Sequence, residues 1–376
     1  MRVICAIDSF KGCMTSKEAN TAAMRGVLEA FPETQVDCFE VSDGGEGFLE
    51  AMRPDEIVTC HVHDALMRRT DSAFGIKDGK AVIEVAKAVG LNKVEPKDRN
   101  PLLATSYGVG ELMVHAMEHG CREFIVGLGG SATSDCGLGM LRCLKHAWQT
   151  KEKKPWYEPF DTSHLKNMKV TLATDVTNPL CGEKGAAYVF APQKGADAVM
   201  VKKLERRART FALMASRHQG YDMSNEPGAG AAGGLGYAFM EFMDAKVRSG
   251  AEIVMESSGL GNVISSFGLA KASLTEGGGV DKRGTTVVVT GEGSADSQTL
   301  MGKWPSVLLK HAEASNVPVV LLAGKVVDRG KLLDAGFSQV VCINDGMDKG
   351  LNPLDKSIAE ERIGAACLYC ISLSNT

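Results

Sequence analysis

Residues 3–18 read VICAIDSFKGCMTSKE, and this stretch decides the fold class. The apolar run at its start, which stops at Asp8, predicts a buried strand of a parallel sheet. Thr15 and Glu18 have the spacing of a capping box, and the apolar periodicity that follows predicts a helix that Pro32 ends. A strand, a polar loop and a helix in immediate succession are typical of an α/β protein.

The same succession recurs along the rest of the chain. Short apolar runs alternate with helical periodicity, and there is no internal repeat. Residues 145–168 are polar and lysine-rich and predict a surface excursion, whereas the glycine-rich residues 275–284 predict a crossing between domains. Further strands are expected at 36–41, 81–86, 123–126, 170–174, 285–290, 317–322 and 339–343, and further helices after Gly47, at 108–118, 137–144, 202–216 and 363–373, and after 227–236.

The composition excludes several functions. The 376 residues suffice for about two domains. The 42 basic and 46 acidic side chains give a net charge of −4, which does not favour binding to the phosphate backbone of nucleic acid. No apolar run is long enough to span a membrane, and 11 cysteines without a secretory pattern predict reduced thiols in a cytoplasmic protein. The pairs Cys367/Cys370 and His115/His119 are interpreted as helical positions rather than redox or metal sites. Whether the chain forms a homo-oligomer stays open.

Carboxylates follow the apolar runs at five places, which is where the strands of an open α/β sheet bind ligands. They are Asp8, Asp43, Asp135, Asp175, and Glu292 with Asp296. Taken one at a time, each is explained as the cap of the following helix. All five together, with glycines beside most of them, favour one shared site.

The residue types in these loops predict phosphoryl transfer. None of the eight histidines lies in them, which argues against a Ser-His-Asp hydrolase. Glycines, serines, a lysine and several carboxylates match a polyanion held by backbone N–H groups together with a divalent cation. No Walker-type phosphate loop is present, and Gly228–Gly233, which satisfies GxGxxG, follows Asn225-Glu226-Pro227 rather than a strand.

Seven motifs in order along the chain resemble those of the bacterial glycerate kinases of type I, which phosphorylate D-glycerate at the 2-hydroxyl. They are Asp8–Gly12, Asp43–Gly47, Thr105–Gly110, Gly129–Asp135, Thr174–Leu180, Gly228–Gly236, and Thr290–Gly293 with Asp296, Gly302 and Lys303. The resemblance implies two α/β domains with the active site in the cleft between them. A flavodoxin-like parallel-sheet domain would comprise residues 1–75 and 285–376, and residues 76–284 would form an inserted α/β domain.

The resemblance also implies the substrates and the cofactor. ATP and Mg²⁺ would phosphorylate D-glycerate to 2-phosphoglycerate, with small molecules as the only partners. The alternatives are a kinase for another small hydroxy acid or sugar acid, or a catalytically silent ligand-binding relative. Ser294 stands where the family usually carries Arg, and Ser42 and Phe48 stand where Ala and Thr are usual, which bears on the identity of the acceptor.

We assign candidate roles to the motif residues on this basis. Lys11 would neutralise phosphate or the substrate carboxylate, Asp175 would be the general base, and Asp43 and Asp296 are the alternatives for that role or for the metal. Mg²⁺ would be bound by Asp175 and Asp296. The phosphates would be bound by Gly129, Gly130, Ser131, Thr133, Ser134, Gly228, Gly230, Gly233 and Gly234, and the substrate by Ser9, Glu46, Asn178 and Lys303.

Overall fold

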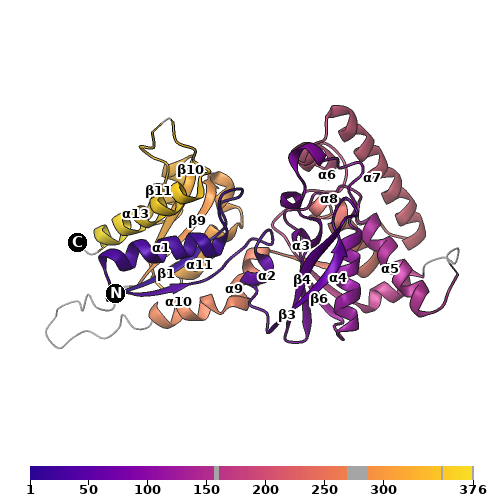
Figure 1. Ribbon diagram of the computed structural model, residues 1–376, viewed down its shortest axis with the longest axis horizontal. Coiled ribbons are helices and arrows are strands. Elements are labelled where there is room, and N and C mark those ends of the chain that lie inside the picture. The colour runs from indigo at the N-terminus through magenta and orange to yellow at the C-terminus, as the bar shows by residue number, and fades with distance from the viewer. Residues whose placement is uncertain (156–160, 269–285, 349, 375–376) are drawn as a thin grey trace. The chain divides into compact units, whose positions relative to one another are not determined.

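The computed structural model describes residues 1–155, 161–268, 286–348 and 350–374 (Figure 1). The chain forms two compact units, which are described one at a time. The first unit contains residues 1–43, 50–52 and 251–376, and the second contains residues 44–49 and 53–250. None of the helices in the described part of the chain is long and apolar enough to cross a membrane.

The first unit has a five-stranded parallel sheet among its described residues. Its order is β11-β10-β9-β1-β2, which is the flavodoxin-like order 2-1-3-4-5 when these strands are numbered along the chain. Strand β2 lies on one side of β1 and β9 lies on the other, so the order in which strands are added to the sheet reverses between β1 and β9. These two strands pair from Arg2 with Thr286 to Ile7 with Gly291. The strands are β1 (Arg2–Ile7), β2 (Gln35–Cys38), β9 (Thr286–Ala295), β10 (Val319–Val326) and β11 (Gln339–Cys342).

Helices cover both faces of this sheet. Alternate β1 side chains, Val3, Cys5 and Ile7, join a buried cluster with α1 and α13. On the other side, the Trp304 indole of α11 is fully buried, and its Nε1 donates to the Ala6 carbonyl at 2.8 Å. The helices are α1 (Ser16–Ala30), α2 (Phe48–Ala51, shared between the units), α9 (Gly250–Ser258), α10 (Leu260–Gly268), η7 (Ser297–Leu300), α11 (Trp304–Glu313), α12 (Arg329–Asp334) and α13 (Lys356–Ser374).

The predicted start of α1 is confirmed. The Thr15 side chain accepts from the Glu18 amide, and the Glu18 carboxylate accepts from the Thr15 amide at 2.8 Å, so both halves of the capping box form. Cys367 and Cys370 are buried in α13, where they pack in the same cluster as α1. Their interpretation as helical core positions is therefore supported by their burial.

Gly26 lets α1 and α13 approach closely (Figure 1). A Cβ at this position would lie 2.4 Å from the Gly364 Cα, whereas a Cβ at Gly364 would meet nothing closer than 3.4 Å. We expect Gly26→Ala to lower the free energy of unfolding by about 1–3 kcal/mol, because the helices must separate. Gly364→Ala, the matched control, should be neutral or stabilising since alanine is the better helix former. Equal melting temperatures for the two variants would contradict the close approach.

The second unit has a six-stranded mixed sheet in its described part, with the order β3-β4-β5-β6-β7-β8. The first three strands pair antiparallel, and β5 to β8 pair parallel. Its core is the cluster around Phe74, Ile83, Leu112, Phe124 and Phe239. The strands are β3 (Glu56–His63), β4 (Arg69–Lys77), β5 (Lys80–Glu84), β6 (Glu123–Gly127), β7 (Lys169–Ala173) and β8 (Lys246–Arg248).

The boundaries of the compact units differ from those expected at residues 75 and 284. Strands β3 and β4 were not predicted, and they join β5, so residues 53–75 belong to the second unit. The chain returns to the first unit at residue 251, ahead of the expected crossing at 275–284, which lies outside the described residues. Antiparallel pairing decides the first of these boundaries, and a polar-rich strand carries only a weak local signal.

Several predicted elements change length. The strand expected at 36–41 ends at Cys38, and the one expected at 81–86 ends at Glu84 because α3 begins there. Helix α5 continues to Lys151, so the surface excursion starts later than residue 145. The helices of this unit are α3 (Val85–Val89), η1 (Leu91–Lys93), η2 (Pro96–Asp98), α4 (Tyr107–Glu118), α5 (Leu138–Lys151), η3 (Thr162–Asn167), α6 (Ala186–Phe190), η4 (Pro192–Lys194), α7 (Ala198–Gln219) and α8 (Ala231–Met243).

Candidate active site

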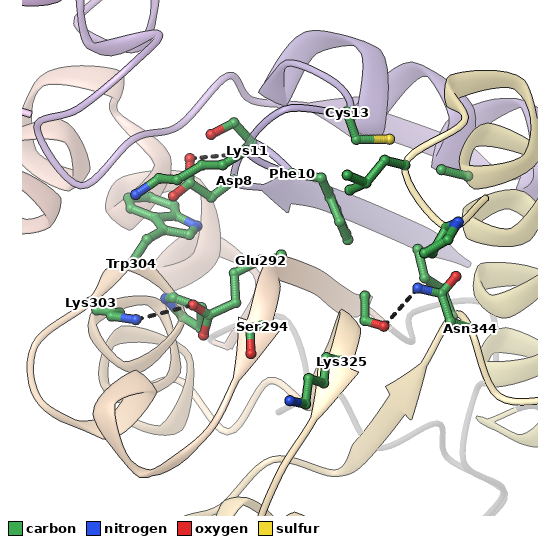
Figure 2. Close-up of a pocket in the computed structure, with 18 of the residues that line it drawn as sticks. Asp8, Phe10, Lys11, Cys13, Glu292, Ser294, Lys303, Trp304, Lys325 and Asn344 are labelled. Carbon is green, nitrogen blue, oxygen red and sulfur yellow. Dashed lines mark hydrogen bonds and ion pairs between the residues drawn. The ribbon is translucent and has the colours of Figure 1, made fainter. Parts of the chain in front are cut away.

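A pocket of about 460 Å³ opens at the carboxyl ends of the first unit's strands. It is lined by the loop after β1 and by the last residues of β9, the two strands that flank the reversal point of the sheet. Ligands of open α/β sheets bind at such a point, because the loops on either side diverge there. Figure 2 shows Asp8, Lys11, Glu292 and Lys303 around this pocket.

Asp8 is a buried carboxylate of the pocket, 8% exposed. Burial raises its pKa well above the usual value, and the negative charges of Asp43 and Glu292 raise it further. A 2.7 Å hydrogen bond from the Ser9 amide and the positive charge of Lys11 lower it in part. The Ser9 amide and Lys11 therefore offset only part of the effect that burial and the neighbouring carboxylates have on Asp8.

Glu292 is the second buried carboxylate of the pocket. Burial raises the pKa of Glu292. The Thr299 hydroxyl, which donates to its Oε1 at 2.6 Å, and the positive charge of Lys303 lower this pKa in part. The Lys303 ammonium lies 3.6 Å from Glu292 Oε2, as the dashed line in Figure 2 shows. Lys303, expected to bind substrate, thus also serves as a partner of Glu292.

Two further lysines line the pocket without an ion pair in the described part of the chain. Lys11 follows β1, and Lys325 lies in β10, both with exposed side chains. Lys325 pairs in register with Ser294 of β9, and both residues line the pocket. Since side chains in register on neighbouring strands share a face of the sheet, Lys325 supplies positive charge beside Ser294.

We expect Asp8→Asn to stabilise the protein at neutral pH. Because the pKa of Asp8 is raised in the folded state, stability is greatest below the ordinary value of 3.8 and falls as the pH rises through the raised pKa. Asparagine keeps the shape and avoids the buried charge. Melting curves in the presence of a chelator should show the variant about 2–4 °C higher at pH 7, corresponding to about 1 kcal/mol, with the difference vanishing toward pH 4. Asp334→Asn, on exposed α12, is the control, and a variant less stable than wild type at pH 7 would contradict the expectation.

In the second unit, the loop after β6 contains most of the predicted phosphate-binding residues. The Gly129 amide donates to the Gly44 carbonyl at 2.9 Å, so it is occupied within the protein. The amides of Gly130, Ser131, Thr133 and Ser134 donate no hydrogen bond to any part of the chain that the structure describes. The Ala132 amide between them donates to the Val89 carbonyl at 2.8 Å, so the loop has four unpaired N–H donors, the kind of group that binds anions.

Asp135, at the end of this loop, is a structural residue. Its Oδ2 accepts from the Ser106 amide at 2.8 Å, the Ser106 hydroxyl at 3.0 Å and the Gly139 amide at 3.0 Å. Its Oδ1 accepts from the Gly137 amide at 3.1 Å. These bonds tie the loop to the starts of α4 and α5, so the explanation of Asp135 as a cap is supported by its contacts.

The glycine-rich segment 228–234 packs against the same loop. Gly233 has a φ of +67°, and a Cβ there would lie 2.0 Å from the Thr133 carbonyl oxygen, so only glycine fits. The Gly230 amide donates to the Asn178 carbonyl at 2.9 Å, and the Cys136 amide donates to the Gly233 carbonyl at 3.1 Å. These glycines let the backbone of residues 228–234 lie close to the backbone of the loop after β6. The Gly230 amide is already hydrogen-bonded within the protein, so it is not available to a phosphate.

The glycerate kinase family model matches residues 3–361 of this chain. The chain belongs to the glycerate kinase family. It is 36% identical to a glycerate kinase of Haemophilus influenzae over 343 residues, 86% of each chain, and 36% identical to a glycerate 2-kinase of Escherichia coli K12 over an alignment of 398 positions that covers both chains entirely. A crystal structure described as that of a glycerate kinase 2 from Salmonella typhimurium LT2 matches with a TM-score of 0.72 and 30% identity, covering 100% of this chain and 98% of that one.

Membership of the glycerate kinase family places the protein among the phosphotransferases that use an alcohol group as acceptor, as the resemblance implied. The α/β class with parallel strands is confirmed as well. The candidate residues divide between the units. Ser9, Lys11, Asp43, Asp296 and Lys303 lie in the first unit, and Glu46, Asp175, Asn178, the residues of the β6 loop and Gly228, Gly230, Gly233 and Gly234 lie in the second.

Several of these side chains are engaged in local structure. Asp296 Oδ1 accepts from the Gln298 amide at 2.7 Å and caps η7. The Asn178 side chain donates to the Lys184 carbonyl at 2.7 Å, and Glu46 Oε1 accepts from the Asn92 side chain at 3.0 Å. Asp175 follows β7 and is half-buried. Such contacts orient a side chain and leave its other lone pairs for a ligand.

The carboxylates of the first-unit pocket are a further candidate set for a magnesium ion, besides Asp175 and Asp296. Mg²⁺ is usually held by one or two carboxylates together with phosphate oxygens and waters. The negative charge of Asp43 raises the pKa of Asp8, and this is the repulsion that a divalent cation would relieve. No group of three His, Cys, Asp or Glu side chains in the described ranges forms a complete metal site, so phosphate oxygens would have to complete the coordination.

The structure adds Lys194 to the residues that sequence reasoning named, and it places two of the named carboxylates in the pocket. Glu292 and Asp8 were recognised as strand-end carboxylates without a role, and their burial gives them one. Lys194 of η4 carried no sequence signal, since it lies in a short Pro-Gln-Lys-Gly turn. It is buried against the β6 loop, and only the folded chain could have revealed this.

Proposed function

We propose that this protein transfers a phosphoryl group from ATP, with Mg²⁺, to the 2-hydroxyl of D-glycerate and forms 2-phosphoglycerate. Membership of the glycerate kinase family, with a glycerate 2-kinase of Escherichia coli K12 similar over the whole chain, carries this proposal. The two groups of residues described above support it. One is a pocket with lysines and carboxylates, and the other is a loop of unpaired backbone amides.

The pocket of the first unit supplies the charges that phosphoryl transfer needs. Asp8 and Asp43 would hold Mg²⁺, which would neutralise phosphate oxygens when bound. Lys11, which lies in the loop beside Asp8, would stabilise the charge on the transferring phosphoryl group. Lys325, beside Ser294, is the exposed cation suited to the carboxylate of the acceptor.

In the second unit, the amides of Gly130, Ser131, Thr133 and Ser134 would bind nucleotide phosphates. Asp175, at the carboxyl end of β7, would accept the proton of the acceptor hydroxyl. The glycines of 228–234 would keep this loop in its conformation through their contact with Thr133.

A coupled assay for ADP release, with the product identified by phosphorus NMR, tests the proposal. ADP should form only when ATP, Mg²⁺ and D-glycerate are all present, and the phosphorus should couple to the proton on carbon 2. Release of ADP with another hydroxy acid or sugar acid but not with glycerate would move the activity to a different acceptor. Binding of ATP without any turnover across these acceptors would identify a silent relative and overturn the proposal.

A further inference from the structure

Lys194 is a buried lysine whose ammonium lies against the β6 loop of the second unit. It is 4% exposed, and its Nζ donates to the Thr133 carbonyl at 2.6 Å and to the Ser131 hydroxyl at 3.1 Å. No carboxylate forms an ion pair with it among the described residues. A buried lysine with a carbonyl and a hydroxyl as its only partners is unusual, because burying a charge without a counter-charge is costly.

The surroundings of Lys194 contain hydrogen-bonding groups that have no partner among the described residues. The Thr133 side chain is fully buried, and neither its hydroxyl nor that of Ser134 has a partner within the described ranges. The Ser131 hydroxyl accepts from Lys194, which leaves its own proton available. The carboxylate that lies nearby, Asp135, is already saturated by its four hydrogen bonds. Unpaired amides and hydroxyls beside a buried ammonium without an ion-pair partner indicate a site for an anion with several oxygens.

The charge state of Lys194 is poised to change with such an anion. Burial lowers its pKa to about 7, and the negative charge of Asp135 raises it in part. On the other side, the backbone of Arg99 packs against Gly195, and the Arg99 guanidinium donates to the Val94 carbonyl. An anion placed on the loop would favour the charged ammonium and so promote uptake of a proton from solvent.

We propose that Lys194 and residues 130–134 form an anion site that takes a phosphate group of the nucleotide, and that Lys194 gains a proton as the anion binds. The identity of the anion rests on the proposed function. Lys194 acts here as a positioning residue, because it holds the loop through Ser131 and Thr133, and as the buried positive charge of the site. The proton links nucleotide affinity to pH.

Calorimetric titration of the wild-type protein with ADP and Mg²⁺ tests the linkage. At about pH 8, in two buffers that differ in ionisation enthalpy, binding should take up a substantial fraction of a proton. Affinity should be highest below pH 7 and should fall as the pH rises through the pKa of the free protein toward that of the complex, because the anion raises the pKa of Lys194. A pH-independent affinity without proton uptake in the wild type would overturn the proposal without any variant.

Substitutions locate the proton. Lys194→Met should weaken ADP binding by roughly 10- to 100-fold, the loss expected for charge-assisted hydrogen bonds, and should abolish proton uptake. Lys194→Arg keeps the charge but cannot titrate, so it should lose proton uptake whatever its affinity. Lys202→Met, an exposed lysine of α7, is the matched control and should behave as wild type. Proton uptake that persists in a folded Lys194→Met or Lys194→Arg variant would overturn the assignment.

The two proposals fail in different ways. Nucleotide binding with Lys194-dependent proton uptake but no phosphorylation of any acceptor would remove the proposed function and leave the anion site. Normal turnover of D-glycerate, with nucleotide affinity that is unchanged by Lys194→Met, would leave the function and remove the anion site.

Discussion

Asp175→Asn is expected to lower kcat for glycerate phosphorylation by about 10²- to 10⁴-fold, the range that loss of a general base produces. Asp175 follows β7 and is half-buried, so its carboxylate is shielded in part from water but not sealed from a ligand. The amide of asparagine keeps the size and loses the ability to accept a proton. Steady-state kinetics with saturating ATP and Mg²⁺ measure the effect, and KM for glycerate should change far less than kcat.

Two controls make this result specific to the base. Asp71→Asn removes an exposed carboxylate of β4 and should leave kcat unchanged. A magnesium titration of Asp175→Asn separates the base from a metal ligand, because excess Mg²⁺ restores activity only where the defect is weak metal binding. A kcat within about tenfold of wild type would exclude Asp175 as the base, and recovery at high Mg²⁺ would return it to the metal site that the sequence also suggested.

Lys11→Met is expected to lower kcat/KM by about 10²- to 10³-fold, as removal of one preorganised positive group from a developing charge does. Lys11 lies in the loop after β1, lines the pocket and acts on the pKa of Asp8. Its side chain is exposed, so the substitution leaves the core of the first unit intact and a folding defect is not expected.

The control for Lys11 is Lys17→Met, at an exposed lysine in the first turn of α1, and this variant should keep full activity. Lys11→Arg should recover part of the lost rate since it keeps the positive charge at a slightly different distance. Comparing kcat with KM assigns the role. A loss confined to KM for glycerate would place Lys11 on the substrate carboxylate, and an unchanged kcat/KM would exclude it from the site.

Much of the local structure followed from the sequence. The strand that stops at Asp8, the capping box of Thr15 and Glu18 and the strands that precede Asp135 and Asp175 are all present. Each depends on residues within one or two turns of the chain, so composition and spacing carry the information. Strands β3 and β4 were not predicted because partly exposed strands with many polar residues have little local signal without their partner strands.

Some features of the candidate site were likewise predicted from the sequence, whereas others are visible only in the folded structure. The sequence marked the carboxylates at the strand ends and the phosphate loop, but it could not say that Asp135 is saturated by α4 and α5 or that Lys303 partners Glu292. Asp135 and Ser106 lie 29 positions apart, and Lys303 contacts Glu292 only because the chain turns through η7 between them, so both facts depend on the folded backbone. The flavodoxin-like strand order came from family resemblance rather than from periodicity, because a period reveals a strand and not its neighbours.

The sequence by itself therefore determined that this is an α/β phosphotransferase with acidic and glycine-rich loops at its strand ends. Only the tertiary structure decided which of those loops carry unmet hydrogen-bonding capacity and which are satisfied within the protein. Lys194 is the sharpest case, since a lysine in a short turn is normally exposed and its burial against Ser131 and Thr133 arises only when the loops pack together. Burial and charge pairing are sums over residues far apart in the chain, whereas secondary structure is largely set by neighbours.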